Sequence, residues 1–327
     1  MSELNRKIKN LGFDFDVSEL GAWTEENIDE LLVRQVTESS TLQEIRIETG
    51  IKGKQKLPVM DTDVVYQDAS NCGMEADGDT AFDKFEIEVH DIGFMQKFCS
   101  SDINRTFLQP ALRPGFANER EDLPFEAQIV AHMLAKHNYQ LERLTWVGDA
   151  DLSTGNLQFF NGFKTLWDAS ADVVETNVQG YTDATVNNIF EIFSDFYANA
   201  NQDIVDADDF IAFTSSAWLK LLVRKLTLMN LFHYSPEQTA DLKRGIVVVP
   251  GTDMTVKATK AFTEGIYGGK RNEMIFGTDL TNDIETIDIW YEKKDDAIYL
   301  RNKFRAGVAN PFDDQISKFT LADSPSS

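Results

Sequence analysis

The sequence is poor in cysteine and histidine and has no long apolar run. Its 327 residues include 2 cysteines and 4 histidines. Cys72 and Cys99 cannot build the disulfide framework of a small secreted domain, so we expect reduced thiols and a reducing compartment. No apolar stretch approaches the roughly 18 residues of a membrane span, and the N-terminus lacks the apolar core of a signal peptide. Membrane-spanning and secreted classes are therefore not expected.

Basic residues are also scarce relative to acidic ones. Lysine and arginine number 31 against 54 aspartate and glutamate residues, which gives a formal net charge of −23 at pH 7. Wrapping nucleic acid on a broad surface needs many cations facing phosphates, so this charge argues against that function. A local basic patch stays compatible with it, and the simplest effect of the charge is solubility.

The sequence contains no motif typical of catalysis by histidine or cysteine. His132 and His137 are five positions apart, which separates them around a helix, and no H-E-x-x-H is present. The cysteines form no C-x-x-C pair. We expect these side chains to be structural, with Cys72 exposed on a loop as a free thiol.

Ion and nucleotide sites are not indicated either. The acidic stretch 75–86 has Thr80 where an EF-hand loop needs glycine, and 206–209 is more simply a solvated turn. The segment 265–270 lacks the spacing of a phosphate-binding loop and is predicted to be a flexible loop. We therefore predict no catalytic residues, no cofactor and no metal.

The first hundred residues indicate two elements without a core of their own. Residues 1–50 are polar, with one helix predicted at about 24–38 from a single apolar stripe. Residues 51–100 read as a β-hairpin: strands are predicted at 64–66 and 85–90, joined by a Gly-, Asp- and Asn-rich loop at 68–80. Because isolated hairpins are marginal in water, neighbouring copies of the chain are expected to stabilise both elements.

The remaining sequence indicates a mixed α and β core. A long helix is predicted at 124–147, opened by Pro124 and closed by Gly148. Alternating helices and strands follow from 181 to 280, starting with a helix capped by Thr182 or Asp183. A closing hairpin is predicted between 287 and 312.

This order of parts resembles the major capsid proteins of tailed bacteriophages with the HK97 fold. The resemblance covers nearly the whole chain and is most specific in the exit segment IFGTDL and the closing strands IYLRNKFRAGVANPF. It implies an α+β chain with five parts: an N-arm at 1–50, an E-loop hairpin at 51–100, a P-domain with a spine helix at 101–180, an A-domain at 181–280, and P-domain closing strands with a tail at 281–327.

The same resemblance implies a structural role. Copies of the chain would assemble as hexamers and pentamers into an icosahedral shell, formed in the host cytoplasm, that encloses double-stranded DNA without reading its sequence. Separate scaffolding, portal and decoration proteins are possible partners. The family's lysine–asparagine cross-link is not expected, because the loop at 68–80 has no lysine.

Eight residues are candidates for contacts between subunits. They come from the hairpin and from the basic face of the last strand: Asn71, Cys72, Phe85, Ile87, Val89, Arg301, Lys303 and Arg305. Two other readings stay open. One is an encapsulin-type compartment of the same fold, and the other is an acidic α/β hydrolase that uses carboxylates.

Overall fold

The computed structural model describes residues 40–62, 65–66, 80–99, 125–230, 241–279, 287–292, 294–295 and 297–322. The helix predicted at about 24–38, nearly all of the acidic loop at 68–80, and the candidates Asn71 and Cys72 lie outside these ranges. The chain divides into two compact units. One comprises residues 1–34, 93–133 and 283–304, and the other comprises residues 35–92, 134–282 and 305–327.

The first unit is built around three strands. β11 (Ile287–Glu292) pairs antiparallel with the first part of β12 (Ala297–Ala309), with Ile287 opposite Asn302 and Glu292 opposite Ala297. β4 (His90–Cys99) also pairs with β12. The turn between β11 and β12 carries Asp295, which accepts a 2.6 Å hydrogen bond from the hydroxyl of Tyr299. The closing hairpin predicted from sequence is therefore confirmed.

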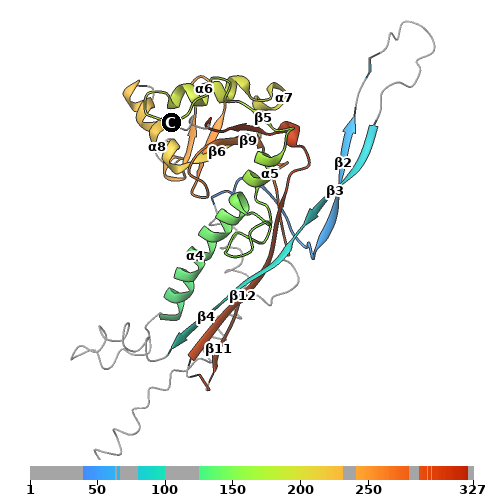
Figure 1. Cartoon of the computed structure of the whole chain (residues 1–327), viewed down its shortest axis with the longest axis vertical. Helices are drawn as coiled ribbons and strands as arrows, with labels where there is room; N and C mark the ends of the chain where they lie inside the picture. The colour runs from blue at the N-terminus through green and yellow to red at the C-terminus, as the bar shows by residue number, and fades with distance from the viewer. Residues whose placement is uncertain are drawn as a thin grey trace, which may run out of the picture. The chain divides into compact units, whose positions relative to one another are not determined.

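The second unit contains a six-stranded sheet in the order β5-β13-β9-β6-β8-β7. Its strands, in chain order, are β5 (Val174–Glu175), β6 (Phe210–Ser215), β7 (Ile246–Val248), β8 (Thr255–Thr259), β9 (Ile266–Lys270) and β13 (Ser317–Phe319). β6 is buried along its whole length and pairs parallel with β8 and antiparallel with β9. Three helices accompany this sheet: α6 (Ile189–Asn199), the short α7 (Gln202–Val205) and α8 (Ser216–Leu228) (Figure 1).

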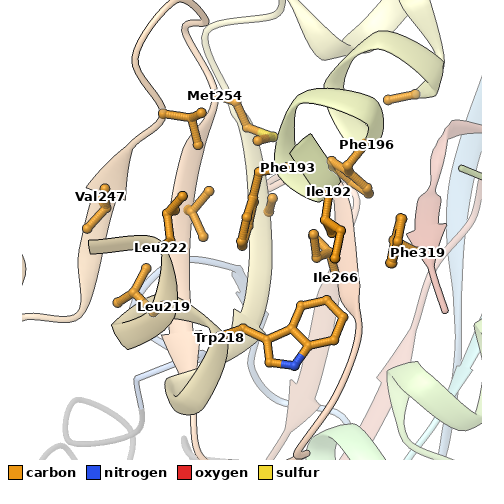
Figure 2. Packing of buried hydrophobic residues seen from close by; sticks show 14 of the residues in the cluster. Ile192, Phe193, Phe196, Trp218, Leu219, Leu222, Val247, Met254, Ile266 and Phe319 are labelled. Atoms are coloured by element: carbon orange, nitrogen blue, oxygen red, sulfur yellow. The ribbon is translucent and has the colours of Figure 1, made fainter. Parts of the chain in front are cut away.

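The core of this sheet lies beneath α6 and α8. Phe193 and Phe196 of α6 and Leu222 of α8 are fully buried, and Figure 2 shows them converging on the sheet. α8 begins where Ser215 ends β6, and the Ser215 hydroxyl accepts a hydrogen bond from Trp218 N. That cap satisfies one of the free N–H groups at the helix start.

The five-stranded sheet that contains β11 and β4 also contains β1 and β10, and its part in this unit joins three segments that are far apart in sequence. β1 (Arg46–Glu48) pairs parallel with β10 (Ile275–Thr278), and β10 pairs antiparallel with the last part of β12.

α4 (Phe125–Val147) matches the predicted helix at 124–147, and the side chains of Leu141, Leu144 and Trp146 in its last turns are buried. α5 (Phe163–Ala169) adds Trp167 to the same aromatic group, with ring centroids of Trp146 and Trp167 5.7 Å apart.

Two predicted element positions are wrong. Residues 65 and 66 are not a strand; the first hairpin strand is β2 (Lys54–Thr62), which pairs with β3 (Thr80–Glu88). The helix expected from Thr182 or Asp183 starts at Ile189 instead, because Asn188 holds a turn before it. The Asn188 Oδ1 accepts from Thr185 N at 2.7 Å and its Nδ2 donates to Asp183 O at 3.0 Å.

The prediction of a flexible loop at 265–270 is also wrong, because residues 266–270 form β9, a central strand of the sheet. Its two glycines are sites of close packing. A Cβ at Gly268 would meet the ring of Phe210 at 2.8 Å, and one at Gly269 would meet Ile316 at 2.4 Å. The sequence did not predict strands β5 and β13, because strands of two or three residues are too short to show a periodic pattern.

Candidate functional site

β2 and β3 form a long two-stranded ribbon of their own (Figure 1). Nine residue pairs join them, from Lys54 opposite Glu88 to Thr62 opposite Thr80. In the described part of the chain no third strand pairs with this ribbon. Both of its outer edges therefore present backbone N–H and C=O groups, which is the arrangement that accepts a further strand or loop. Pro58 removes one donor from the edge of β2.

The two faces of the ribbon differ in character. Lys54 lies between two carboxylates of β3, with its Nζ 3.2 Å from Glu86 and 3.1 Å from Glu88. On the other face, Leu57 and Phe85 are half-buried and sit directly opposite each other. The charged face is solvated, since all three charged residues are exposed.

Beyond this half-buried pair the ribbon exposes apolar surface. Met60 is 63% exposed, and Tyr66, just after β2, is 95% exposed. Among the residues that the structure describes, a tyrosine side chain this exposed has no extensive packing partner. Clusters of exposed apolar groups mark contact surfaces more often than isolated ones do.

The root of the ribbon is fixed in its own unit. Ile87 and Val89 are buried against Ile51, Ile275 and Ala309. Two of the sequence candidates for contacts between subunits are thus brought together, but inside this chain. The third, Phe85, packs only partly against the same cluster.

A pair of glycines makes room for this root. Gly277 of β10 and Gly307 of β12 are directly opposite each other in the sheet. A Cβ on Gly307 would lie 2.0 Å from the carbonyl oxygen of Glu88, and one on Gly277 would lie 2.7 Å from Ile87. We call this pair the glycine seat. The backbone of β3 can approach the sheet this closely only because both positions lack a side chain.

The basic candidates of β12 fall into two groups. Arg305 is held within the chain: its Nε lies 2.6 Å from Asp91 and its Nη1 lies 2.7 Å from Asp279. Hydrogen bonding to Asp91 raises the pKa of Arg305 further above its usual range. Arg301 is half-buried and Lys303 is exposed. Lys303 is therefore the most accessible of the three.

Sequence reasoning missed a buried polar cluster where the N-terminal segment enters the second unit. Glu142 of α4 accepts hydrogen bonds from the hydroxyls of Ser40, of Thr41 at 3.3 Å and of Thr259 at 2.6 Å. The indole N–H of Trp146 donates to the Thr41 hydroxyl at 2.7 Å. We call this group the arm anchor. The residues that Glu142 bonds lie more than a hundred positions away from it in the sequence. No local sequence pattern therefore predicts this cluster.

An ion cluster follows the arm anchor along the chain. Glu44 meets Arg271 at 2.5 Å and the almost fully buried Lys257 at 3.4 Å. These contacts attach residues 40–48 to β8 and to the turn after β9, and β1 pairs with β10 in addition. The segment thus has a fixed position from residue 40 onwards.

No arrangement for catalysis or metal binding appears in the residues that the structure describes. Within them, no group of three or more His, Cys, Asp and Glu side chains could hold a metal ion. Burial lowers the pKa of His137 from 6.5 to about 4, so this imidazole is neutral at pH 7. Over the same ranges, no helix is long and apolar enough to cross a membrane.

No family model matches the sequence, and no curated protein matches it either. Solved structures do match. A chain of the satellite phage P4 procapsid, in a structure that includes the size determination protein Sid, matches with a TM-score of 0.56 and 10% identity, covering 99% of both chains. A capsid chain of the empty GTA particle has a TM-score of 0.56 and 13% identity, covering 87% of this chain and 90% of that one.

A third match has the same character. The capsid of Myoviridae phage XM1 gives a TM-score of 0.53 and 12% identity over 86% of this chain and 92% of that one. At such low identity the likeness shows the fold. The chain has the mixed α+β fold of phage capsid proteins, as the sequence resemblance predicted.

Proposed function

We propose that this chain is the major capsid protein of a tailed bacteriophage, a structural protein that assembles into the shell of the virion. The observation that carries the proposal is a fold match that extends over 99% of both this chain and a phage procapsid chain. A match of that extent leaves little of the chain for a separate catalytic domain. The proposed role is therefore structural and not enzymatic.

The parts of the HK97 fold can be assigned to the elements described above. The β2–β3 ribbon corresponds to the E-loop. α4 corresponds to the spine helix of the P-domain, with β11 and β12 as its long strands. The six-stranded sheet with α6, α7 and α8 corresponds to the A-domain. Residues before the arm anchor correspond to the N-arm, which is consistent with a chain that is held from Ser40 onwards.

The contacts between subunits are proposed to involve the outer part of the ribbon. Exposed Met60 and Tyr66 support this, together with the two open ribbon edges. Asn71 and Cys72, which follow β2 in sequence, stay contact candidates. Phe85 and the basic residues Arg301, Lys303 and Arg305 are candidates at the inner end. Ile87 and Val89 are proposed to act by holding the ribbon root, since both are buried in their own chain.

The shell is proposed to be icosahedral, built from hexamers and pentamers of this chain. It would form in the host cytoplasm and enclose double-stranded DNA without sequence-specific contacts. A scaffolding protein, a portal and decoration proteins are the partners such a shell would take. The net charge of −23 supports loose enclosure of DNA over tight binding along the inner surface.

Electron microscopy of the expressed chain tests the proposal. We expect closed hollow particles tens of nanometres across, formed alone or with a scaffolding protein from the same source. The matched control lacks residues 69–79 between β2 and β3. It should keep the far-ultraviolet spectrum and thermal midpoint of the second unit but form few or no shells. Finding only monomers and small oligomers under all conditions, native particles included, would reject the proposal.

A further inference from the structure

Charge is distributed very unevenly over the helices of the six-stranded sheet. Residues 181–210, which include α6 and α7, contain seven acidic residues and no lysine or arginine. Residues 211–230, which include α8, contain three basic residues and no acidic one. A chain with a net charge of −23 thus has a basic segment that directly follows a purely acidic one in sequence.

These elements occupy different halves of the sheet. α8 packs against β6 and β8, near the edge strand β7, whereas α6 packs against β13 and α7 against β9. Figure 2 shows the same division, with Leu219 and Leu222 of α8 toward Val247 and Phe196 of α6 toward Phe319. α6 also packs against α8, so the division holds for α7 and its following turn, which lie over a different half of the sheet from the exposed basic residues of α8.

The basic side consists of exposed residues from two elements. Lys220 and Arg224 lie one helical turn apart on α8, and Lys243 and Arg244 directly precede β7. Two exposed acidic residues, Asp241 and Asp253, lie in the segments that flank β7. Among the described residues of this side, the basic ones outnumber the acidic ones, which gives these residues a net positive charge.

The acidic side consists of α7 and the turn that follows it. Asp203, Asp206 and Asp208 are exposed there, and Asp209 is half-buried. Asp206 accepts a hydrogen bond from the Tyr197 hydroxyl, and this bond raises the pKa of the tyrosine. Asp203 and Asp208 are also exposed at the surface.

Exposed apolar side chains accompany both sides. Leu228, at the end of α8, is 70% exposed and Val248 of β7 is 55% exposed. Val178, shortly after the opposite edge strand β5, is 70% exposed. A contact that joins the two sides would remove apolar surface from water as well as pair charges.

We propose that the basic side of one copy binds the acidic side of the next copy, and that this contact joins copies into rings. The inference rests on the proposed shell function and names the surfaces that would build its rings. Because the two sides are different surfaces of one domain, the contact is head-to-tail, and head-to-tail contacts close into rings when the rotation between copies permits it.

Nucleic acid fits the basic side less well than a second copy does. A phosphate backbone along α8 would also pass the carboxylates of α6, which packs directly against α8. The Debye length at physiological salt is about 8 Å, so these acids would repel it at that range. A second copy instead offers the acidic side described above, whose charge is complementary to that of the basic side.

Charge reversal on each side tests the contact. The basic-side variant carries Lys220→Glu and Arg224→Glu, and the acidic-side variant carries Asp203→Lys and Asp208→Lys. Each should lower the fraction of chain in rings or shells at least tenfold, because like charges then face each other. The variant with all four substitutions restores opposite charges at every contact. It should assemble within about threefold of the unchanged chain.

Mixing the two single-side variants gives a sharper readout. Alternating copies meet through opposite charges, so rings with an even number of copies are complementary throughout. A five-membered ring must contain at least one like-charged contact. An equimolar mixture should therefore form six-membered rings and no five-membered ones, as counted by native mass spectrometry or electron microscopy.

Several outcomes would overturn the contact. Normal assembly of both single-side variants would do so. Failure of the four-substitution variant to assemble, when each single-side variant is also defective, would do so too. Binding of a short DNA duplex that depends on Lys220 and Arg224, with assembly unchanged in their variant, would assign the surface to nucleic acid instead.

Circular dichroism and the thermal midpoint verify folding. If the reversals unfold the chain, Lys220→Gln with Arg224→Gln replaces them, with a smaller loss expected. The unchanged chain separates the two hypotheses. If it forms no rings or shells, the proposed function fails; if it assembles but the charge pattern has no effect, only this contact fails.

Discussion

Two glycines decide how the β2–β3 ribbon meets the rest of its unit. Gly277 and Gly307 face each other across β10 and β12, and the chain at Glu88 passes directly over them. Neither glycine has a positive φ, so their role is to leave space and not to permit an unusual backbone. Any side chain at position 307 would therefore push the backbone at Glu88 away and change the direction in which the ribbon leaves the sheet.

Gly307→Ala should destabilise the chain by about 3 kcal/mol or more, because the new methyl group would overlap the Glu88 carbonyl and backbone must move. Gly53→Ala is the matched control, since nothing lies within 4 Å of its Cβ position. It should stay within about 0.5 kcal/mol of the unchanged chain. Denaturant unfolding measures both, and equal midpoints would show that the seat can relax at no cost.

His137 makes stability depend on pH. Its pKa is about 4 in the folded chain, against 6.5 for an unperturbed histidine, because burial disfavours the charged imidazole. The folded state binds the proton less well than the unfolded state. The contribution of the neutral His137 side chain to the free energy of unfolding is therefore complete above pH 6.5. It is lost as the pH falls toward 4.

His137→Gln should remove this dependence. Between pH 7 and pH 4, the unchanged chain should lose up to about 3 kcal/mol of unfolding free energy relative to the variant. Urea unfolding of both proteins over this range measures the difference, in which the titration of other groups cancels. Parallel pH profiles would show that the imidazole can become protonated in the folded state without cost.

At the scale of elements, the arm anchor fixes where the N-terminal segment joins the second unit. Glu142 collects three hydroxyl donors, and Glu44 adds two cations a few residues later. Buried carboxylates are stable only when so surrounded, because an unpaired charge in the interior is costly. Segment 40–48 is thus held by side chains as much as by the pairing of β1 with β10.

Glu142→Ala should cost about 3 kcal/mol, since it leaves buried hydroxyls without their acceptor. Glu142→Gln keeps one acceptor oxygen and should cost less. Limited proteolysis near residue 40 should be faster in the alanine variant than in Lys136→Ala, an exposed position on the same helix. Equal cleavage rates in these two variants would contradict the anchor.

Elements with strong local signals could be predicted from the sequence. α4 follows from its apolar stripe between Pro124 and Gly148, and α8 follows from its cap at Ser215. β9 could not be predicted, because Gly268 and Gly269 resemble a loop until the rings and side chains that fill the space above them are known.

The candidate site was predictable only in part. Alternation at Phe85, Ile87 and Val89 correctly indicated a strand with one apolar face. The residues that cover that face, Ile51, Ile275 and Ala309, come from distant parts of the chain. The arm anchor depends on pairings over more than a hundred positions, and local sequence carries no signal for those.

At the scale of the whole molecule, net charge opposes association while local charge favours it. Every copy carries a net charge of −23, so bringing many copies together in the proposed shell would raise their mutual repulsion. The contact proposed between the basic and acidic sides acts over a few ångströms. These two effects respond differently to salt, because screening removes long-range forces first.

Assembly should therefore depend on salt in two directions. Raising the ionic strength from about 0.01 M to 0.15 M shortens the Debye length from about 30 Å to 8 Å, which weakens the repulsion between whole copies. The concentration needed for assembly should fall several-fold. Near 1 M, where the length is about 3 Å, the paired charges are screened too and the required concentration should rise again.

Light scattering at a series of protein concentrations measures this threshold. The four-substitution variant should follow the same curve as the unchanged chain. In the variant with Lys220→Gln and Arg224→Gln, the concentration needed for assembly should not rise again at high salt. A threshold that only falls as salt increases would indicate that apolar contacts alone join the copies.

Strand β13 has a consequence for how the protein is made. Ser317–Phe319 lies between β5 and β9, and Phe319 is fully buried in the core beneath α6 and α8. Synthesis proceeds from the N-terminus, so the ribosome has already made the other five strands of this sheet before the residue that completes its core exists. A chain broken off before residue 316 has the ribbon and both charged sides in its sequence but cannot close this core. We therefore expect a copy that lacks the last strand to leave this core open, and such a copy would not be able to join the proposed shell.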